Sequence, residues 1–218
     1  MTRKLGPRTL VIATHNAGKL MEIRALLSPY GVACVSAGSL GLPEPEETGA
    51  SFLANARLKA EAARDGTRLA AVGDDSGLVV PALGGQPGIH SARWAGPERD
   101  FAVAMARLDR EVRAAGPDRA AHFISLIVLA LPDGREVIFE GRVDGTLVWP
   151  PRGTGGFGYD AMFVPAVRVP TVRVPGGKDP ATGRSFAEMP FAEKQGYSHR
   201  GIALRALVAN LRQEVSAG

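Results

Sequence analysis

Two adjacent carboxylates interrupt an apolar stretch that reads Val72-Gly73-Asp74-Asp75-Ser76-Gly77-Leu78. The flanking runs, Leu69-Ala70-Ala71-Val72 and Leu78-Val79-Val80, are typical of short buried strands, so we expect the two acids at a strand end. Adjacent carboxylates repel each other, and a hard divalent cation that takes oxygen ligands is the usual reason to tolerate that cost. A solvated Asp-Asp-Ser-Gly turn is the alternative, and the stretch taken alone favours it. Other parts of the chain must decide between a metal site and a turn.

The composition of the 218 residues is that of an ordinary globular protein, with a hydrophobic share of 45%. Cys34 is the only cysteine, which excludes an intrachain disulfide and favours a reducing compartment. The N-terminus lacks the apolar core of a signal peptide and no run is long enough to span a bilayer, so we expect a cytoplasmic protein with no membrane partner. The net charge is +4, but the arginines are spread rather than clustered, which favours small phosphorylated ligands over long nucleic acid.

The segment from Thr9 to Lys19 reads as a buried strand, a loop of small residues and the start of a helix. Backbone N–H groups and the helix dipole favour an anion at such a place, and Lys19 adds a positive charge. A plain strand-to-helix connection capped by Asn16 explains the segment equally well. The full glycine pattern of a P-loop or a dinucleotide fingerprint is absent, so neither is predicted.

An acidic loop that ends in Glu46-Glu47-Thr48-Gly49 precedes a helix that we expect to open at Ser51. Asn55 and Lys59 are four residues apart and therefore share a face of this helix. A lysine or a glutamate pair in such a place is usually solvated, unless the fold brings it to the Asp74-Asp75 pair.

The middle of the chain predicts a mixed sheet. The run 120–131 is too rich in Phe, Ile and Val for an exposed helix and is expected to be a central strand. The turn signal Pro132-Asp133-Gly134-Arg135 then predicts an antiparallel partner over 137–148. Residues 101–115 form an expected helix, with Phe101, Met105, Leu108 and Val112 on its inner face. We expect one domain over 1–218 with two lobes, and a surface insertion over 166–184.

The loop Pro150-Pro151-Arg152-Gly153-Thr154-Gly155-Gly156-Phe157-Gly158-Tyr159-Asp160 has too much glycine and proline for regular structure. Such a loop lets backbone approach a ligand, and a base could stack on Phe157 while Asp160 accepts from a ring N–H. For the aromatic residues alone, packing in the core is the favoured alternative. Farther on, we expect a helix over 186–195, with Pro190 near a helix start. We also expect a last helix capped by Ser198, which places His199 and Arg200 in a first turn where the dipole disfavours cations. This placement suggests an anionic or oxygen-rich ligand.

Taken in order, these segments resemble the inosine/xanthosine triphosphate pyrophosphatases, the Ham1-like enzymes that remove noncanonical purine triphosphates. The resemblance covers nearly the whole chain and includes six ordered motifs: 13–19, 47–59, 74–78, 84–93, 155–160 and 198–201. It implies a long, twisted mixed sheet flanked by helices, an α/β fold with two lobes and a central active-site cleft, commonly as a homodimer. The segment 166–184 is longer than its family counterpart, and Ala161 stands where the family often has proline.

The resemblance also implies site residues for hydrolysis between the α- and β-phosphates of ITP, dITP or XTP. Glu47 and Asp75 would hold Mg²⁺, and Asp75 would also be the base that activates water. The substrate-binding residues implied for the triphosphate and nucleotide are Thr14, Asn16, Lys19, Lys59 and Ser76. Those implied for the purine are Phe157, Asp160, Lys194, His199 and Arg200, of which the last three would recognise the 6-oxo group. Gly158 and Tyr159 are implied as further substrate-binding residues.

Two other functions compete with this one. A Maf-like pyrophosphatase would act on pyrimidine or modified nucleotides. A nucleotide- or RNA-binding module without catalytic activity would bind but not turn over its ligand, and the basic charge favours it.

Overall fold

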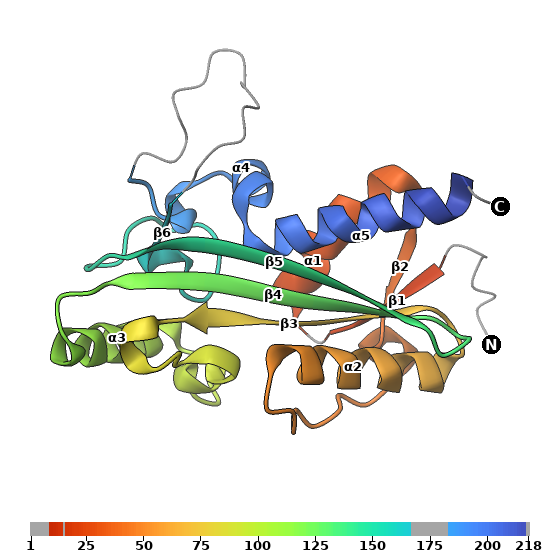
Figure 1. Cartoon of the computed structure of the whole chain (residues 1–218), viewed down its shortest axis with the longest axis horizontal. Helices are drawn as coiled ribbons and strands as arrows, with labels where there is room; N and C mark the ends of the chain where they lie inside the picture. Colours follow the sequence, from red (N-terminus) through yellow and green to blue (C-terminus); the bar gives the residue numbers. More distant parts are fainter. Residues whose placement is uncertain (1–8, 15, 167–182, 217–218) are drawn as a thin grey trace, which may run out of the picture. The chain divides into compact units, whose positions relative to one another are not determined.

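The fold is a six-stranded mixed sheet flanked by helices, seen in a computed structural model that describes residues 9–14, 16–166 and 183–216 (Figure 1). The strand order is β2-β1-β3-β4-β5-β6, with β1 parallel to β2 and β3, and β5 antiparallel to β6. The strands are β1 (Thr9–Ala13), β2 (Ala33–Ser36), β3 (Ala71–Val79), β4 (Ala120–Ala130), β5 (Glu136–Leu147) and β6 (Phe163–Pro165). The helices are α1 (Ala17–Leu27), α2 (Phe52–Thr67), α3 (Phe101–Ala115), α4 (Phe191–Tyr197) and α5 (His199–Ser216). None of the described helices is both long and apolar enough to cross a membrane.

The chain divides into two compact units, named here unit 1 and unit 2. Unit 1 comprises Met1–Ser76, Ser125–Gly141 and Arg200–Gly218, and unit 2 comprises Gly77–Ile124 and Arg142–His199. The boundaries fall inside β3, β4 and β5 and after the first residue of α5. A single domain with two lobes around a cleft stays a prediction. The expected insertion over 166–184 lies almost wholly outside the described residues, which omit 167–182.

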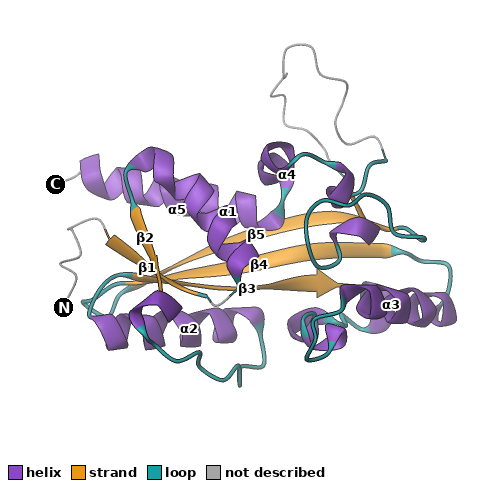
Figure 2. Cartoon of the chain, turned by 180° about the vertical axis from the view of Figure 1, so that it is seen from behind, coloured by secondary structure: helices purple, strands orange, loops and turns teal. Residues whose placement is uncertain are grey.

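Unit 1 packs helices on both faces of its strands, and β1 shows how the sequence directs this. Alternate residues of a strand point to opposite faces, and all five residues of β1 are buried. Leu10 and Ile12 belong to a core with residues of α1 and α5, whereas Val11 and Ala13 belong to a second cluster with Ala63 of α2. Both views show α1 and α5 on one side of these strands and α2 on the other (Figures 1 and 2).

Unit 2 is built around aromatic rings and the buried side of α3. Met105, Leu108 and Val112 are buried as their helical spacing predicts. Phe123 of β4 contacts the rings of Phe163 and Phe186 at centroid distances of 4.7 and 6.1 Å. The strand predicted over 120–131 is therefore confirmed, and β5 follows it at the tight turn closed by the Leu131 N–H to Arg135 O hydrogen bond.

Two local expectations were wrong. Asp74 and Asp75 do not lie at a strand end, because β3 runs without a break through nine residues from Ala71 to Val79. Pairing of β3 between β1 and β4, together with burial, outweighs the turn propensity of Asp, Ser and Gly. The helix expected over 186–195 is instead divided into a 3-10 turn, Phe186–Glu188, and α4, which begins after Pro190. Proline cannot continue a helix from its preceding residues, and here it stands as the N-terminal flanking residue of α4.

Candidate active site

Asp74 and Asp75 point to opposite faces of β3. Val72 belongs to the core under α1 and α5, so Asp74, two residues later, faces the same helices. Ala71 belongs to the cluster with α2, so Asp75, four residues later, faces α2. The two carboxylates are buried, with exposures of 2% and 6%, and each therefore has its own set of partners.

On the α2 face, three polar side chains and one backbone N–H gather around Asp75. Asn55 donates from Nδ2 to Asp75 Oδ2 at 3.2 Å, and the Ser76 N–H donates to Asp75 Oδ1 at 3.0 Å. The Lys59 ammonium lies 3.6 Å from Asp75 Oδ1 and forms an ion pair with Glu47. The expectation that Asn55 and Lys59 share a face is confirmed. The Lys59 ammonium therefore contacts both the acidic loop, through Glu47, and β3, through Asp75.

Close packing of α2 on β3 makes these contacts possible. A Cβ on Gly73 would lie 2.1 Å from the carbonyl oxygen of Ala56 and 2.6 Å from the nitrogen of Ala60. The absence of a side chain at this position lets the helix backbone touch the strand. Ser51 caps α2 as predicted, because its side chain accepts from the Ala54 N–H.

On this face, burial outweighs the positive charges of Lys59 and Lys19 in setting the pKa of Asp75. Burial raises the pKa of the Asp75 carboxyl, and the nearby carboxylates of Glu47 and Asp74 add to the rise. Burial alone would lower the pKa of Lys59, but the charge of Asp75 and the bond with Glu47 raise it, so this lysine stays charged.

On the opposite face, Asp74 forms a buried network with two cations and a hydroxyl. Its carboxylate lies 2.7 Å from Lys19 Nζ and 3.4 Å from Arg200 Nε, and it accepts from the Ser125 hydroxyl at 2.8 Å. Burial alone would raise the pKa of Asp74, but Lys19 and Arg200 outweigh it and hold the pKa well below its usual range. Arg200 also forms an ion pair with buried Glu22.

The N-terminus of α1 has the form expected of an anion site. Asn16 caps the helix by accepting from the Lys19 N–H at 3.1 Å, and Thr14 Oγ1 accepts from the Asn16 N–H at 3.2 Å. No acidic residue stands in the first turn. Backbone donors, the helix dipole and the Lys19 ammonium therefore all favour a negative ligand at this end of α1. Ser76 is linked to the same network, since its hydroxyl accepts from Arg200 Nη2 at 2.6 Å.

In unit 2, the loop residues predicted to hold a base form a separate cluster. Asp160 Oδ2 accepts from the Phe157 N–H at 2.8 Å and lies 2.7 Å from Lys194 Nζ. The Lys194 ammonium is 4.6 Å from the centre of the Phe157 ring, and Phe157 is 39% exposed. A Cβ on Gly156, whose φ is +70°, would lie 2.2 Å from Asp160 Oδ2. Only glycine suits this turn, which presents one exposed aromatic residue beside a buried carboxylate and its lysine.

The other predicted residues of unit 2 are buried or fixed in the loop. Tyr159 is 2% exposed, donates its hydroxyl to the Ser91 carbonyl at 2.9 Å and packs edge-on against Phe101. Burial raises the pKa of Tyr159, so its hydroxyl keeps its proton. His199 stacks on Phe123 with a centroid distance of 4.7 Å, and Gly158 has a φ of +67°. The roles expected of these residues toward a substrate stay predictions.

The donor set around Asp75 fits a magnesium ion that is shared with a ligand. Among residues 9–14, 16–166 and 183–216, no group of three or more His, Cys, Asp or Glu is placed to hold a metal. Glu47 and Asp75 nevertheless both reach Lys59, so two carboxylates converge at one point. Mg²⁺ is usually held by one or two carboxylates together with waters and substrate phosphates, so this pair is sufficient.

Known proteins resemble this chain over most of its length. A model of the Ham1 family matches residues 10–210. The chain belongs to the Ham1 family. A protein of Bradyrhizobium sp. named dITP/XTP pyrophosphatase is 56% identical over 206 residues, which cover 93% of this chain and 89% of the relative. A Caulobacter vibrioides protein of the same name is 50% identical, covering 93% and 97%.

Solved structures extend the Ham1 likeness to the fold. A HAM1 protein from Coxiella burnetii superposes with a TM-score of 0.81 at 34% identity, covering 94% of this chain and 98% of that one. A dITP/XTP pyrophosphatase from Mycobacterium abscessus has a TM-score of 0.67 at 42% identity, covering 91% and 97%. The family resemblance inferred from the six motifs is confirmed.

Three residues of this Ham1 chain were missed as site residues. Asn55 was noted for its face but not for its contact with Asp75, and Glu22 and Ser125 were not considered. Glu22 follows Lys19 by three residues on α1, so helical spacing could have placed them together. Ser125 is a hydroxyl within the apolar run of β4, and such an isolated polar residue indicates a buried partner.

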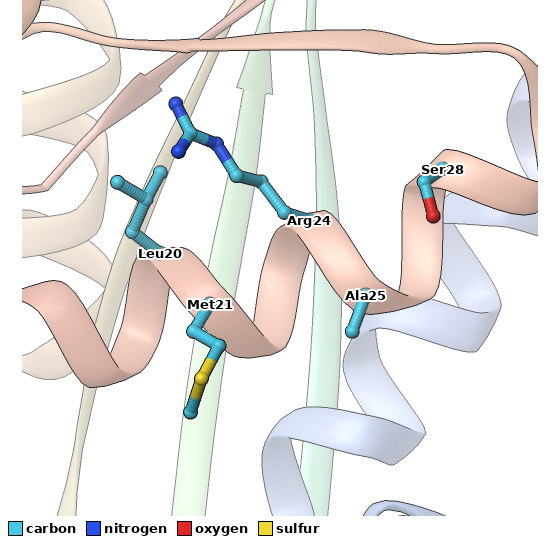
Figure 3. A pocket seen from close by; sticks show the side chains of 5 residues that line it. All are labelled: Leu20, Met21, Arg24, Ala25 and Ser28. Carbon is cyan, nitrogen blue, oxygen red and sulfur yellow. The ribbon is translucent and has the colours of Figure 1, made fainter.

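A shallow hollow on α1 is distinct from these clusters. It is lined by Leu20, Met21, Arg24, Ala25 and Ser28, which lie along one stretch of the chain at α1 (Figure 3). None of the predicted Ham1 site residues lines it.

Proposed function

We propose that this chain is a nucleoside triphosphate pyrophosphatase that hydrolyses dITP, ITP and XTP to the monophosphate and pyrophosphate. The arrangement that carries the proposal is the buried Asp75 carboxylate, held by Asn55 and placed with Glu47 around the Lys59 ammonium. In this arrangement Asp75 would be the base and a metal ligand, Glu47 the second metal ligand, and Lys59 the cation. Membership of the Ham1 family and the names of the relatives support the same activity.

In the proposed reaction, residues of unit 1 handle the triphosphate. The N-terminus of α1, with Thr14 and Asn16, would bind phosphate oxygens through backbone and side-chain donors. Lys19 and Lys59 would offset the negative charge that grows on the leaving pyrophosphate, and Ser76 would contact the nucleotide. Placing cations where charge develops is the main contribution a protein makes to phosphoryl transfer.

Asp75 would act as the general base. Its carboxylate would accept a proton from the attacking water while a phosphorus–oxygen bond forms to that water. The bond to the bridging oxygen of the α–β anhydride breaks, and its electron pair leaves with pyrophosphate. The burial that raises the pKa of Asp75 makes it a stronger base than an exposed aspartate.

Glu47 and Asp75 would hold Mg²⁺, which neutralises phosphate charge when it is bound. Their approach to a common cation in Lys59 supports this role. Omission of the metal should therefore abolish pyrophosphate release.

A second set of residues would select the base. The exposed ring of Phe157 offers a stacking surface, with Gly158 and Tyr159 in the same loop, while Asp160 and Lys194 supply an acceptor and a donor at its edge. His199 and Arg200 would donate to the carbonyl at C6 of hypoxanthine or xanthine, where adenine has an amino group that would meet another donor. Guanine shares this carbonyl, so its rejection requires a contact elsewhere.

A substrate panel tests the proposal. The protein is incubated with Mg²⁺ and with dITP, XTP, dATP, dGTP, dTTP or UTP, and pyrophosphate and inorganic phosphate are measured separately. We expect pyrophosphate from dITP and XTP, little turnover of dATP, and none without Mg²⁺. A preference for dTTP or UTP would support the Maf-like alternative, and binding without turnover would support the binding module.

We further propose a cytoplasmic homodimer. Sedimentation at equilibrium, in which a mass of twice 22.9 kDa is expected, tests the assembly.

A further inference from the structure

We propose that Asn55 is a positioning residue that fixes the separation of the two metal-binding carboxylates by tying the acidic loop to Asp75. The inference rests on the proposed function only for the roles of Glu47 and Asp75. Asn55 itself is 1% exposed, and its side chain makes two hydrogen bonds, one as a donor and one as an acceptor. Nδ2 donates to Asp75 Oδ2 at 3.2 Å, and Oδ1 accepts from the Gly49 N–H at 2.8 Å.

The chemistry of the two partners sets the orientation of the Asn55 amide. The Gly49 N–H can only donate and the Asp75 carboxylate can only accept, so the oxygen must face the loop and the nitrogen must face the acid. Asparagine is the shortest side chain that carries both a donor and an acceptor on one rigid plane. A carboxylate in its place would meet Asp75 with like charge, and an apolar side chain would leave the Gly49 N–H without this partner.

The contact between Gly49 and Asn55 requires a residue without a side chain at position 49. A Cβ on Gly49 would lie 2.5 Å from Asn55 Oδ1, 2.8 Å from Ala54 Cβ and 2.9 Å from the Asn55 nitrogen. Any larger residue would push the loop away from α2 and lengthen the bond. Glu47 is two residues before Gly49, so the anchor limits where the Glu47 carboxylate can lie.

The far side of Asp75 is held as well. Oδ1 accepts from the Ser76 N–H at 3.0 Å, while Oδ2 accepts from Asn55, so each carboxylate oxygen has a fixed donor. Asn55 is thus the one described side chain that bonds both to Asp75 and to the backbone of the loop that carries Glu47. Partners that orient metal ligands typically contribute about 10- to 100-fold to metal affinity or activity.

The test uses the full chain and three variants: Asn55→Leu, Gly49→Ala and the double variant. Asn55→Leu removes both hydrogen bonds and keeps the branched shape of the side chain, whereas Gly49→Ala disturbs the loop contact and leaves Asn55 and Asp75 unchanged. Asn210→Leu on α5 is the control, because it makes the same substitution in a helix of unit 1 away from Asp75. Circular dichroism and thermal melting establish that each variant is folded.

The deciding measurement is Mn²⁺ affinity without nucleotide, by electron paramagnetic resonance of free Mn²⁺. We expect each single variant to weaken Mn²⁺ binding about 10- to 100-fold. The double variant should bind Mn²⁺ no more weakly than the single variant with the lower affinity, because both substitutions disrupt the same Gly49–Asn55–Asp75 link. In turnover assays, raised Mg²⁺ should restore much of kcat with little change in KM, which a general loss of folded protein would not do.

A second measurement is hydrogen exchange at the backbone amide of residue 49 in metal-free protein, which should be faster in both single variants and unchanged in Asn210→Leu. Unchanged Mn²⁺ affinity in the two single variants, or full additivity in the double variant, would overturn the proposal. If Asn55→Leu does not fold, Gly49→Ala decides the question alone. A wild-type protein that binds Mn²⁺ but releases no pyrophosphate from dITP or XTP would refute the proposed function and leave this inference standing.

Discussion

Replacing Asp74 with asparagine should destabilise the protein far more than replacing an exposed aspartate. The Asp74 carboxylate is 2% exposed and faces Lys19 at 2.7 Å and Arg200 at 3.4 Å. The neutral amide of the variant would keep a partner for the Ser125 hydroxyl but leave Lys19 and Arg200 without the carboxylate that they share, although Arg200 keeps its ion pair with Glu22. Removing one member of a buried ion pair costs about 3–5 kcal/mol, a large part of the roughly 5–15 kcal/mol that stabilises a folded domain.

The assay is urea unfolding of the wild type, Asp74→Asn and the control Asp144→Asn. Asp144 pairs with Arg142 at 2.7 Å, but the two side chains are 65% and 49% exposed, so its loss should cost no more than about 1 kcal/mol. Far-UV circular dichroism reports the whole chain, and the fluorescence of Trp94 and Trp149 reports unit 2. Coincidence of the two signals establishes a single transition from which the free energy of unfolding is taken.

The effect should also depend on pH with a definite sign. Lys19 and Arg200 hold the pKa of folded Asp74 well below the value of about 3.9 that it has in the unfolded chain. Its contribution is therefore complete above the unfolded pKa and is lost as the pH falls toward the folded pKa. The difference in the free energy of unfolding between the wild type and Asp74→Asn should be constant above about pH 5 and decrease below about pH 4. A loss of unfolding free energy no larger than that of Asp144→Asn would refute this account of the network. So would a difference between wild type and Asp74→Asn that does not decrease in acid.

Three further changes test the proposed roles. Asp75→Asn should lower kcat by about 10²- to 10⁴-fold while equilibrium binding of dITP is largely kept, and an active variant would remove Asp75 as the base. Phe157→Ala should raise KM for dITP, because stacking of a base on an aromatic ring contributes about 1–3 kcal/mol, and an unchanged KM would place the base elsewhere. His199→Ala or Arg200→Ala should narrow the ratio of kcat/KM for dITP over dATP by about 2- to 10-fold, the effect of one hydrogen bond, and an unchanged ratio would remove both residues from base recognition.

Local sequence patterns predicted the parts of the fold whose causes are local. The strand from Thr9 to Ala13 and the caps Asn16 and Ser51 depend on neighbouring residues, and all three were predicted. The shared face of Asn55 and Lys59 follows from helical spacing and was also predicted. These features needed no knowledge of how distant segments pair.

The interactions that escaped prediction connect residues far apart in the chain. Glu22 and Arg200 are separated by 178 residues, and Asp74 and Ser125 by 51, so no local pattern relates them. The error over β3 has the same origin. Gly73, Ser76 and Gly77 are turn formers, and the segment becomes a strand because β3 pairs with β1 and β4 and is buried on both faces.

The continuity of β3 changes what the two adjacent acids can do. At a strand end both carboxylates could have faced one metal, whereas within a strand their directions are opposite. Asp74 is left to neutralise Lys19 and Arg200 on one face. On the other face, Asp75 contacts Asn55 and Lys59, and Lys59 also pairs with Glu47. The register that pairs Val11 with Ala71 and Ala13 with Gly73 decides which acid faces α2. A slip of one residue would exchange the two faces, so the parallel pairing of β1 with β3 is what assigns the proposed catalytic role to Asp75.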